Sequence, residues 1–581
     1  MSWHRSFANG KLYTDRGGGD LMLEPHSKPL IVQSDMTLLL NMKQAGAEEA
    51  AEKLLALAEL VKRPGGWHTY RMTAMTLWQA CASGMAAEDV MALLKRYAAT
   101  SIPGYTEMSI RKWMGRYGKL HLELVGDKLM LSGSAELLTE LTHHPDIGPK
   151  LASAELAAYL NGEGVEIRQE ERGLLKQELA RLGYPVIDQA GYHAGEALTV
   201  QLREETLQGK PFGLRGYQQQ AVDVFCAEGS VHGGSGVVVL PCGAGKTIVG
   251  LAALAKLSSA TLILTSSTTS VKQWKRELLD KTTLQGEHIG EYAGGLKQVR
   301  PVTIATYQIL TSRKAKSDAY QHMNLFSERD WGLIIYDEVH LLPAPVFRMT
   351  ADLQATRRLG LTATLVREDG CAEDVFSLIG PKQYEWLWKA VEAEGHIASV
   401  HCTEIRIPLD EAVRKRYADA APRSQLRLAA ENPSKADVIT ELLKRHEGVP
   451  TLIIGQYLDQ LHSVAQALAI PVITGELEQD KRQLLYDRFR SGEIPVLAVS
   501  KVANFAVDLP DAAVAIQISG SYGSRQEEAQ RIGRILRPKQ GRNEAWFYTV
   551  VSDGTKELDF ALRRQLFMVE QGYRYALESR E

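Results

Sequence analysis

Residues 237–247 read Val-Val-Val-Leu-Pro-Cys-Gly-Ala-Gly-Lys-Thr, and residues 248–257 after them are rich in alanine and leucine. The β-branched run predicts a strand and the Ala/Leu run predicts a helix, so the glycine-containing loop between them has the order of a P-loop. In such a loop, backbone N–H groups and the helix N-terminus face phosphate oxygens. This stretch therefore predicts an α/β fold that binds a nucleotide.

The loop supplies the expected phosphate-binding residues: Leu240, Pro241, Cys242, Gly243, Ala244, Gly245, Lys246 and Thr247. Lys246 would reach the β/γ-phosphates, and the Thr247 hydroxyl would ligate Mg²⁺. Leu240 stands where the full motif has its first glycine, so the match is to the shortened Gly-x-Gly-Lys-Thr form.

Two carboxylates follow another apolar run, Leu333 to Tyr336. Ligands of open α/β sheets bind at the carboxyl ends of the strands, which is where Asp337 and Glu338 would lie. We expect Asp337 to hold the magnesium ion and Glu338 to orient or deprotonate the water that attacks the γ-phosphate.

A basic cluster near the C-terminus reads Gln530-Arg531-Ile532-Gly533-Arg534-Ile535-Leu536-Arg537. Arg534 and Arg537 are spaced i, i+3, so they share one helical face and suit a single phosphate. Arginines supplied across an interface offset the charge of a transferring phosphoryl group. We therefore expect Gln530, Arg534 and Arg537 to complete the catalytic site when two domains close.

Short β-branched runs alternate with helical segments from about residue 213 onward, which predicts two α/β domains with parallel sheets in series. Strands are expected over 237–240, 261–265, 302–305, 333–336, 451–454, 472–474, 496–499 and 514–518. We divide the rest into an extended lead-in (1–29), an α+β module (30–148) and a second small unit (149–204). The first module includes a helix over 47–63 and a hairpin turning at Gly126-Asp127.

Composition is that of an ordinary globular chain: 581 residues, 45% hydrophobic and 24% charged, with a net charge of 67 − 70 = −3. This excludes disordered and collagen-like classes, and a polyanion partner would need a local basic patch. The five cysteines are too widely spaced for a zinc or iron–sulfur motif. Because no apolar run approaches about 20 residues and no signal peptide is visible, we expect a cytoplasmic protein with no membrane partner.

Further motifs make the chain, over about residues 30–575, resemble the superfamily-two DNA helicases and, within them, the XPB group. They are Arg215-x-Tyr217-Gln218, the P-loop, Ser270-Val271-x-Gln273-Trp274, Asp337-Glu338-Val339-His340, Leu361-Thr362-Ala363-Thr364-Leu365-Val366-Arg367-Glu368-Asp369, Ser500-Lys501-Val502 with Asp508-Leu509-Pro510, and the arginine cluster.

The resemblance implies two tandem RecA-like motor domains, 205–385 and 386–581, preceded by the small α+β modules, of which 149–204 matches a damage-recognition module in position. It implies ATP and Mg²⁺ as cofactors, single-stranded and duplex DNA as partners, 3′-to-5′ movement, a role in nucleotide excision repair and a separate nuclease subunit. Arg215, Gln218 and Asp508 would join the ATP site. Strand separation would involve Thr362, Thr364, Arg367, Glu368 and Asp369. A thumb-like insertion at about 405–432 would contact DNA through Arg414, Lys415, Arg416 and Tyr417, since cations around an aromatic ring suit phosphates and bases.

Two alternatives stay open. An RNA helicase is poorly distinguished by sequence, because a motor that tracks the backbone need not read the 2′-hydroxyl. A recruitment protein gated by nucleotide would need neither Glu338 nor the arginines, which speaks against it.

Overall fold

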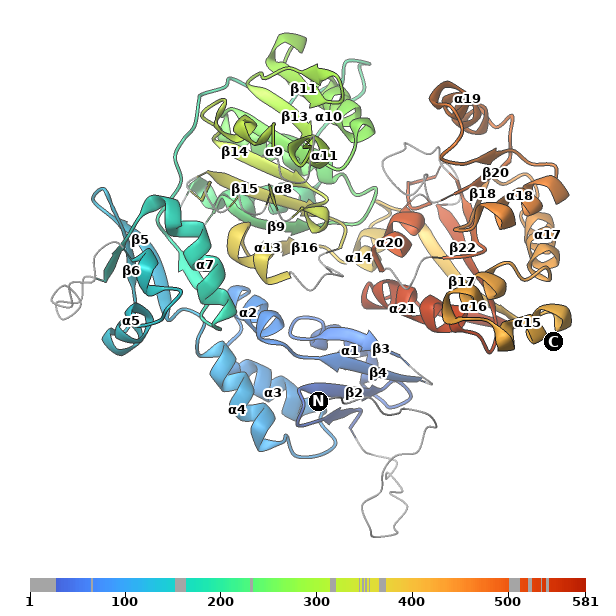
Figure 1. Cartoon of the computed structure of the whole chain (residues 1–581), viewed down its shortest axis with the longest axis horizontal. Helices are drawn as coiled ribbons and strands as arrows, with labels where there is room; N and C mark the ends of the chain where they lie inside the picture. The colour runs from blue at the N-terminus through green and yellow to red at the C-terminus, as the bar shows by residue number, and fades with distance from the viewer. Residues whose placement is uncertain are drawn as a thin grey trace, which may run out of the picture.

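The computed structural model describes residues 28–580 apart from 64–65, 152–163, 230–232, 314–319, 344, 347–349, 351–352, 355, 365–371, 501–511, 521–524, 534 and 540–542. Four units follow one another along the chain (Figure 1). We call them the N-terminal unit (30–114), the second unit (120–188), the first α/β domain (216–385) and the second α/β domain (388–579).

The first α/β domain is built on an eight-stranded sheet in the order β12-β11-β13-β10-β14-β15-β9-β16. Its strands pair in parallel except β11 with β12. The strands are β9 Ser235–Val239, β10 Thr261–Thr265, β11 Ile289–Ala293, β12 Leu296–Lys297, β13 Val302–Thr306, β14 Leu333–Asp337, β15 Arg357–Thr362 and β16 Lys382–Glu385. The helices are α8 Gly216–Cys226, α9 Lys246–Leu257, α10 Thr268–Lys281, α11 Tyr307–Leu310 and α13 Ala372–Leu378.

The second α/β domain has seven parallel strands in the order β19-β20-β18-β21-β22-β17-β23. They are β17 Ser399–Ile407, β18 Thr451–Ile454, β19 Val472–Ile473, β20 Val496–Val499, β21 Val514–Gln517, β22 Glu544–Ser552 and β23 Tyr575–Ser579. Its helices are α14 Trp388–Ala393, α15 Glu411–Asp419, α16 Pro422–Ala430, α17 Lys435–Arg445, α18 Leu458–Ala467, α19 Gln479–Arg490, α20 Arg525–Gly533 and α21 Lys556–Glu570. The predicted fold class, two parallel α/β domains in tandem, is confirmed.

The N-terminal unit is an antiparallel sheet, β1-β2-β4-β3, packed with helices. Its elements are β1 Leu30–Val32, β2 Thr37–Asn41, α1 Ala47–Leu54, β3 Glu59–Lys62, β4 Trp67–Arg71, α2 Ala74–Ala82, α3 Ala87–Tyr97 and α4 Gly104–Met114. The helix expected over 47–63 is therefore wrong in its second half. Residues 59–62 instead form β3, because pairing with β4 satisfies their backbone groups.

The second unit is a four-stranded sheet in the order β7-β6-β5-β8 with a core of its own. It contains β5 Leu120–Val125, β6 Lys128–Ser132, α5 Ala135–Thr142, β7 Val165–Ile167, α7 Arg172–Arg181 and β8 Val186–Asp188. The expected hairpin is present, but the expected boundary at residues 148–149 cuts through this sheet. The structure corrects that boundary to the segment between α4 and β5, because both strands of the hairpin pair with later strands.

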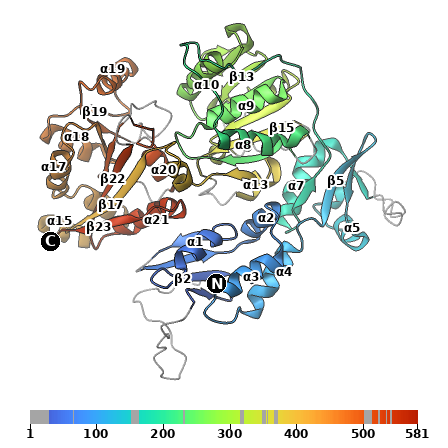
Figure 2. The same ribbon diagram turned by 180° about the vertical axis from the view of Figure 1, so that it is seen from behind.

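The two small units pack on the α/β domains at different places (Figures 1 and 2). The N-terminal unit lies beneath both α/β domains: Leu566 of α21 packs into its core, and Lys382 N at β16 donates a hydrogen bond to Gln79 of α2 at 3.0 Å. The second unit contacts the first α/β domain through α7, where Gln177 donates to Asp374 of α13 at 2.6 Å.

Candidate active site

The P-loop connects β9 to α9 as the sequence predicts. Gly243 (φ 82°) and Gly245 (φ 83°) adopt left-handed backbone conformations that favour glycine, and Lys246 begins α9. Ala244 is buried while Lys246 and Thr247 are half-buried. The loop thus places two functional side chains, Lys246 and Thr247, at the N-terminus of α9. A helix N-terminus favours the binding of an anion.

Residues at the start of α8 hold the loop through hydrogen bonds. The Tyr217 hydroxyl and the Gln218 amide nitrogen donate to the Ala244 carbonyl at 2.7 and 3.0 Å. Arg215 donates to both, through its backbone N–H to Gln218 Oε1 at 3.0 Å and through its guanidinium to the Tyr217 hydroxyl at 3.1 Å. Tyr217 belongs to the motif Arg215-x-Tyr217-Gln218, but the residues expected at the ATP site did not include it.

The two acids lie where β14 ends. The Trp274 indole N–H donates to Asp337 Oδ2 at 2.9 Å, and Lys246 Nζ lies 3.9 Å from Glu338 Oε1. Burial, and next the charge of Glu338, raise the pKa of Asp337 to about 6 against the opposing effect of Trp274 and Lys246. A cation beside this carboxylate would favour its charged form.

Glu338 has an unusual backbone. Its φ of 52° and ψ of 53° place a non-glycine residue in the left-handed region, a conformation that clusters at functional sites. Among the described residues, its Oε2 atom is buried without a hydrogen-bond partner, and His340 Nδ1 lies 3.5 Å from it. An orphaned carboxylate oxygen next to the P-loop lysine is suited to accept a hydrogen bond from water.

Thr362 and Thr364, which the resemblance assigns to strand separation, are 0% and 3% exposed. The Thr362 hydroxyl lies 2.8 Å from His340 Nδ1, and the Thr364 N–H donates to that hydroxyl at 3.1 Å. The Leu240 N–H donates to the Thr362 carbonyl at 3.0 Å. This strand end therefore joins the P-loop to His340.

A magnesium ion fits the donors present. The Thr247 hydroxyl and the Asp337 carboxylate are the hard oxygen ligands that Mg²⁺ prefers. The described part of the chain holds no cluster of three His, Cys, Asp or Glu side chains suited to a metal. Mg²⁺ characteristically relies on nucleotide phosphates and water for its other ligands, so such a sparse protein contribution is sufficient.

The second α/β domain reaches this loop through the C-terminal end of α20. A Cβ atom added to Gly533 would lie 2.4 Å from Cys242 Cβ, and one added to Gly243 would lie 4.0 Å from Cγ of Arg537. Arg537 is half-buried there. The structure thus brings together the P-loop and one of the two predicted arginines, although almost 300 residues separate them.

Several predicted residues cannot be placed. Arg367, Glu368, Asp369, Asp508 and Arg534 lie outside the described residues, as does the side chain of Gln530.

The expected thumb is a pair of helices, α15 and α16. Arg414, Lys415 and Arg416 are exposed on α15. Tyr417 differs from the expectation, because its hydroxyl accepts a hydrogen bond from the Lys556 N–H at the start of α21, at 3.0 Å. The tyrosine anchors α15, while the three cations face solvent.

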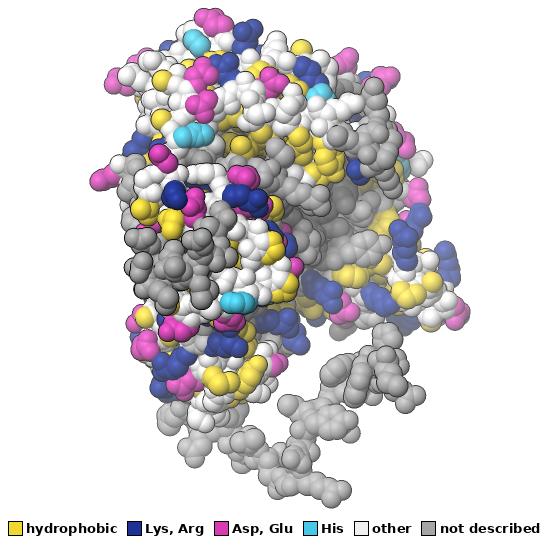
Figure 3. Space-filling view, turned by 60° about the vertical axis from the view of Figure 1, so that its left-hand side comes forward, with side chains coloured by type: hydrophobic (Ala, Val, Ile, Leu, Met, Phe, Trp, Pro, Cys, Tyr) yellow, Lys and Arg dark blue, Asp and Glu magenta, His cyan; other side chains and the backbone are white. Residues whose placement is uncertain are grey.

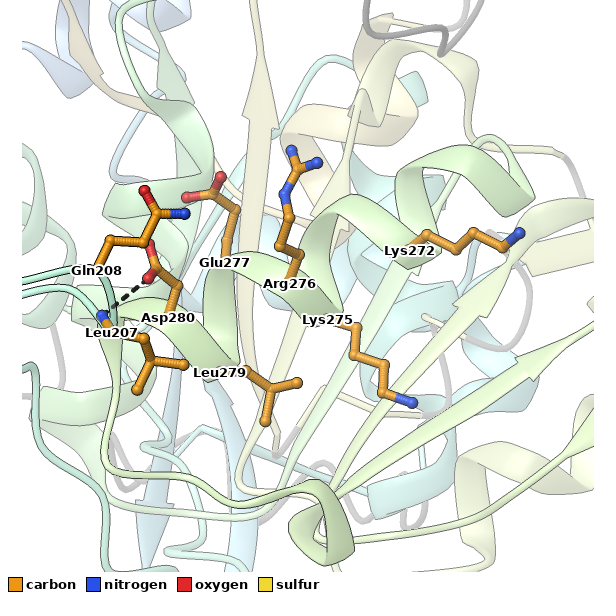
Figure 4. A pocket seen from close by; sticks show the side chains of 8 residues that line it. All are labelled: Leu207, Gln208, Lys272, Lys275, Arg276, Glu277, Leu279 and Asp280. Carbon is orange, nitrogen blue, oxygen red and sulfur yellow. Dashed lines mark hydrogen bonds between the residues drawn. The ribbon is translucent and has the colours of Figure 1, made fainter. Parts of the chain in front are cut away.

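A hollow of about 560 Å³ lies away from the ATP site, on α10 (Figure 4). Three cationic side chains of α10 point in different directions: Lys272, Lys275 and Arg276. Lys275 forms an ion pair with Glu291 at 2.7 Å. Because the cations do not converge, this hollow does not resemble a second phosphate site.

Comparisons with known proteins find family models and relatives that are similar to this chain. Residues 391–580 match the family model of the ERCC3/RAD25/XPB C-terminal helicase, 30–155 match a helicase conserved C-terminal domain, and 211–367 match the type III restriction enzyme res subunit.

The chain is 50% identical over 555 residues to the DNA 3′-5′ helicase XPB of Kineococcus radiotolerans, with 94% of this chain and 96% of that protein covered. It is 48% identical over 551 residues to the protein of the same name from Mycobacterium tuberculosis, at 94% and 97% coverage. It is 33% identical over 573 residues to the general transcription and DNA repair factor IIH helicase/translocase subunit XPB of Antonospora locustae, at 95% and 82% coverage. None of the described helices is long and apolar enough to cross a bilayer.

Proposed function

The chain belongs to the XPB family of DNA 3′-5′ helicases, and from that premise we propose that it hydrolyses ATP between its two α/β domains to move along DNA. The observation that carries the proposal is the contact of α20 with the P-loop, where Gly533 packs on Cys242 and Arg537 approaches Gly243. A site completed by the second domain ties turnover to domain closure.

We assign each predicted residue a role, and the positions of Lys246, Glu338 and Arg537 support theirs. Lys246 binds the β/γ-phosphates, and Glu338 holds the attacking water through its unpaired oxygen. Arg537 offsets transition-state charge, and we assign Arg534 and Gln530 to the same task. Thr247 and Asp337 would hold Mg²⁺, which when bound with ATP supplies positive charge to the phosphate oxygens.

DNA is the proposed track, in keeping with the names of the bacterial relatives. The exposed cations of α15 suit phosphate contacts. On the face shown in Figure 3, Lys and Arg side chains are interspersed with acidic and hydrophobic ones. We include a role in DNA repair because the eukaryotic relative is named as a subunit of a transcription and DNA repair factor. A separate nuclease partner stays a prediction.

Unwinding of tailed duplexes tests the proposal. With ATP and Mg²⁺, wild type should displace the short strand of a duplex that carries a 3′ single-stranded tail, and Lys246→Ala should not. A duplex with a 5′ tail is the matched control for direction. Equal unwinding of both substrates would contradict the polarity, and unwinding by Lys246→Ala would contradict the assignment of the site.

A further inference from the structure

The N-terminal unit is joined to the second α/β domain by more than surface contact. Leu566 of α21 is 2% exposed and belongs to the apolar core of the N-terminal unit. On the same helix, the neighbouring Gln565 is fully buried. A hydrophobic side chain of one unit that is buried in the core of another stabilises the contact between the two units.

Arg63, directly after β3, makes a polar contact of the N-terminal unit at this junction. Its guanidinium donates to Gln565 Oε1, and its Cζ lies 5.4 Å from the centre of the Tyr575 ring. Gln565 in turn donates through Nε2 to Glu404, a carboxylate buried on β17. Burial lowers the pKa of Arg63, while the neighbouring groups of the second domain, Tyr575 and Glu404, raise it.

Tyr575 continues the contact into the second domain. Its hydroxyl donates to Glu528 Oε1 at 3.4 Å, and Glu528 Oε2 lies 3.6 Å from Arg564 Nε. Glu528 and Arg564 are 0% and 1% exposed. A fully buried carboxylate needs such partners, because leaving the charge unpaired is strongly unfavourable.

Glu528 lies on α20, the helix that meets the P-loop. It precedes Gly533, which packs on Cys242, by five residues and little more than one helical turn. A shift of Glu528 would therefore be transmitted along a single rigid helix to Gly533, where α20 contacts Cys242 of the P-loop.

We propose that Arg63, Tyr575 and Glu528 form a relay through which the N-terminal unit positions α20, and with it the contact of Gly533 with the P-loop. The relay rests on the proposed function, since it gives these residues an effect on catalysis only if the contact of α20 with the P-loop is needed for ATP turnover. Arg63 is a positioning residue: it acts on turnover from the N-terminal unit, through the side chains it contacts.

The test is steady-state, DNA-stimulated ATP hydrolysis by the full chain. Arg63→Ala should lower kcat about tenfold, the loss expected for one charge-assisted hydrogen bond, with KM for ATP unchanged because the P-loop is intact. Tyr575→Phe, which keeps the ring under Arg63 and loses only the hydroxyl, should lower kcat in the same way. Arg63→Lys should restore part of the loss.

The control breaks a different contact of the same two units. Glu48 on α1 pairs with Arg574, and their side chains are 72% and 78% exposed. Glu48→Gln should leave kcat within about twofold of wild type, because exposed ion pairs contribute little.

A double-mutant cycle separates the relay from general loosening of the interface. Arg63→Ala and Tyr575→Phe together should lower kcat no further than either alone, whereas independent effects would multiply. Unchanged kcat in both single variants, multiplied losses, or equal changes in kcat and KM would overturn the relay. If wild type itself shows no more turnover than Lys246→Ala in this assay, the proposed function fails instead.

Discussion

Glu338 combines backbone strain, burial and charge in one residue. A left-handed conformation costs a non-glycine residue on the order of 1–3 kcal/mol, so the surrounding fold must impose it. The carboxylate lies between Lys246 and His340, and its Oε2 atom has no hydrogen-bond partner in the described part of the chain. The strain is thus located where a water molecule would be oriented.

We expect Glu338→Gln to reduce ATP turnover about 100-fold or more, because the amide has the size of the carboxylate but neither its charge nor its basicity. ATP binding should survive, since Lys246 and the loop are unchanged. Steady-state ATP hydrolysis and titration with a fluorescent ATP analogue measure the two effects. Glu287→Gln, at an exposed position of the same domain, is the control and should leave both unchanged. Turnover near the wild-type rate in Glu338→Gln would contradict the assigned role.

At the scale of elements, α20 must approach the P-loop without a side chain in between. A Cβ atom at Gly533 would lie 2.4 Å from Cys242 Cβ and 2.8 Å from Sγ, distances at which atoms must move. Glycine at this helix end is explained by close contact with a neighbouring domain. Its φ is not positive, so conformational freedom is not the reason.

Gly533→Ala should therefore separate α20 from the loop and lower kcat for ATP about tenfold, in line with the cost of overpacking. Nucleotide affinity, which depends on the first α/β domain, should change little. Gly104→Ala is the matched control, because Gly104 also lies in a helix and an added Cβ would meet nothing within 4 Å. Equal activity of the two variants would mean that the contact between Gly533 and Cys242 is not needed for turnover.

The elements also show what sequence reasoning could reach. The strands of both parallel sheets were predictable, because a strand buried on both faces is a continuous β-branched run. The second half of the 47–63 helix was not, since its apolar spacing fits a helix and only the partner strand β4 decides against it. The expected domain boundary at residues 148–149 was misplaced for a similar reason. Strands β7 and β8 have three residues each and are recognisable only by their pairing with the hairpin.

In the site, the residues of each motif were predictable and their distant contacts were not. The P-loop and both acids follow strands, so their chemistry is visible locally. Three contacts are visible only in the packed chain. Tyr217 bonds to Ala244, Thr362 is buried against His340, and Tyr417 joins α15 to the start of α21.

The whole molecule is held together by a buried ion cluster as well as by the shared cores. Arg172 and Lys176 of α7 pair with Asp188 at 2.6 and 2.8 Å, and Lys176 also donates to Gln354 of the first α/β domain at 2.8 Å. Burial alone would raise the pKa of Asp188, but the charges of Lys176 and Arg172 outweigh it and hold that pKa well below its usual range. The Asp188 carboxylate therefore joins α7 to β8 within the second unit, and Lys176 extends this cluster to the first α/β domain.

Asp188→Asn should loosen the second unit by about 3–5 kcal/mol, because it leaves two buried cations without their counter-charge. Limited proteolysis followed by mass spectrometry should show faster cleavage within residues 115–190. The stabilisation by the wild-type carboxylate is complete above its pKa in the unfolded chain, about 4, and declines as the pH falls toward the lower folded-state pKa. Glu166→Gln, which breaks the exposed pair with Lys128 in the same unit, should change cleavage little. Equal cleavage of the two variants would contradict the role of the cluster.

The most direct test of the central claim, a DNA-driven ATPase with its site between two domains, is ATP turnover by wild type and Lys246→Ala at one stated salt concentration. Four conditions are compared: no nucleic acid, single-stranded DNA, duplex DNA and RNA. We predict turnover that DNA stimulates more than RNA does and that the variant loses. Turnover that is independent of DNA, or that persists in Lys246→Ala, would contradict the account.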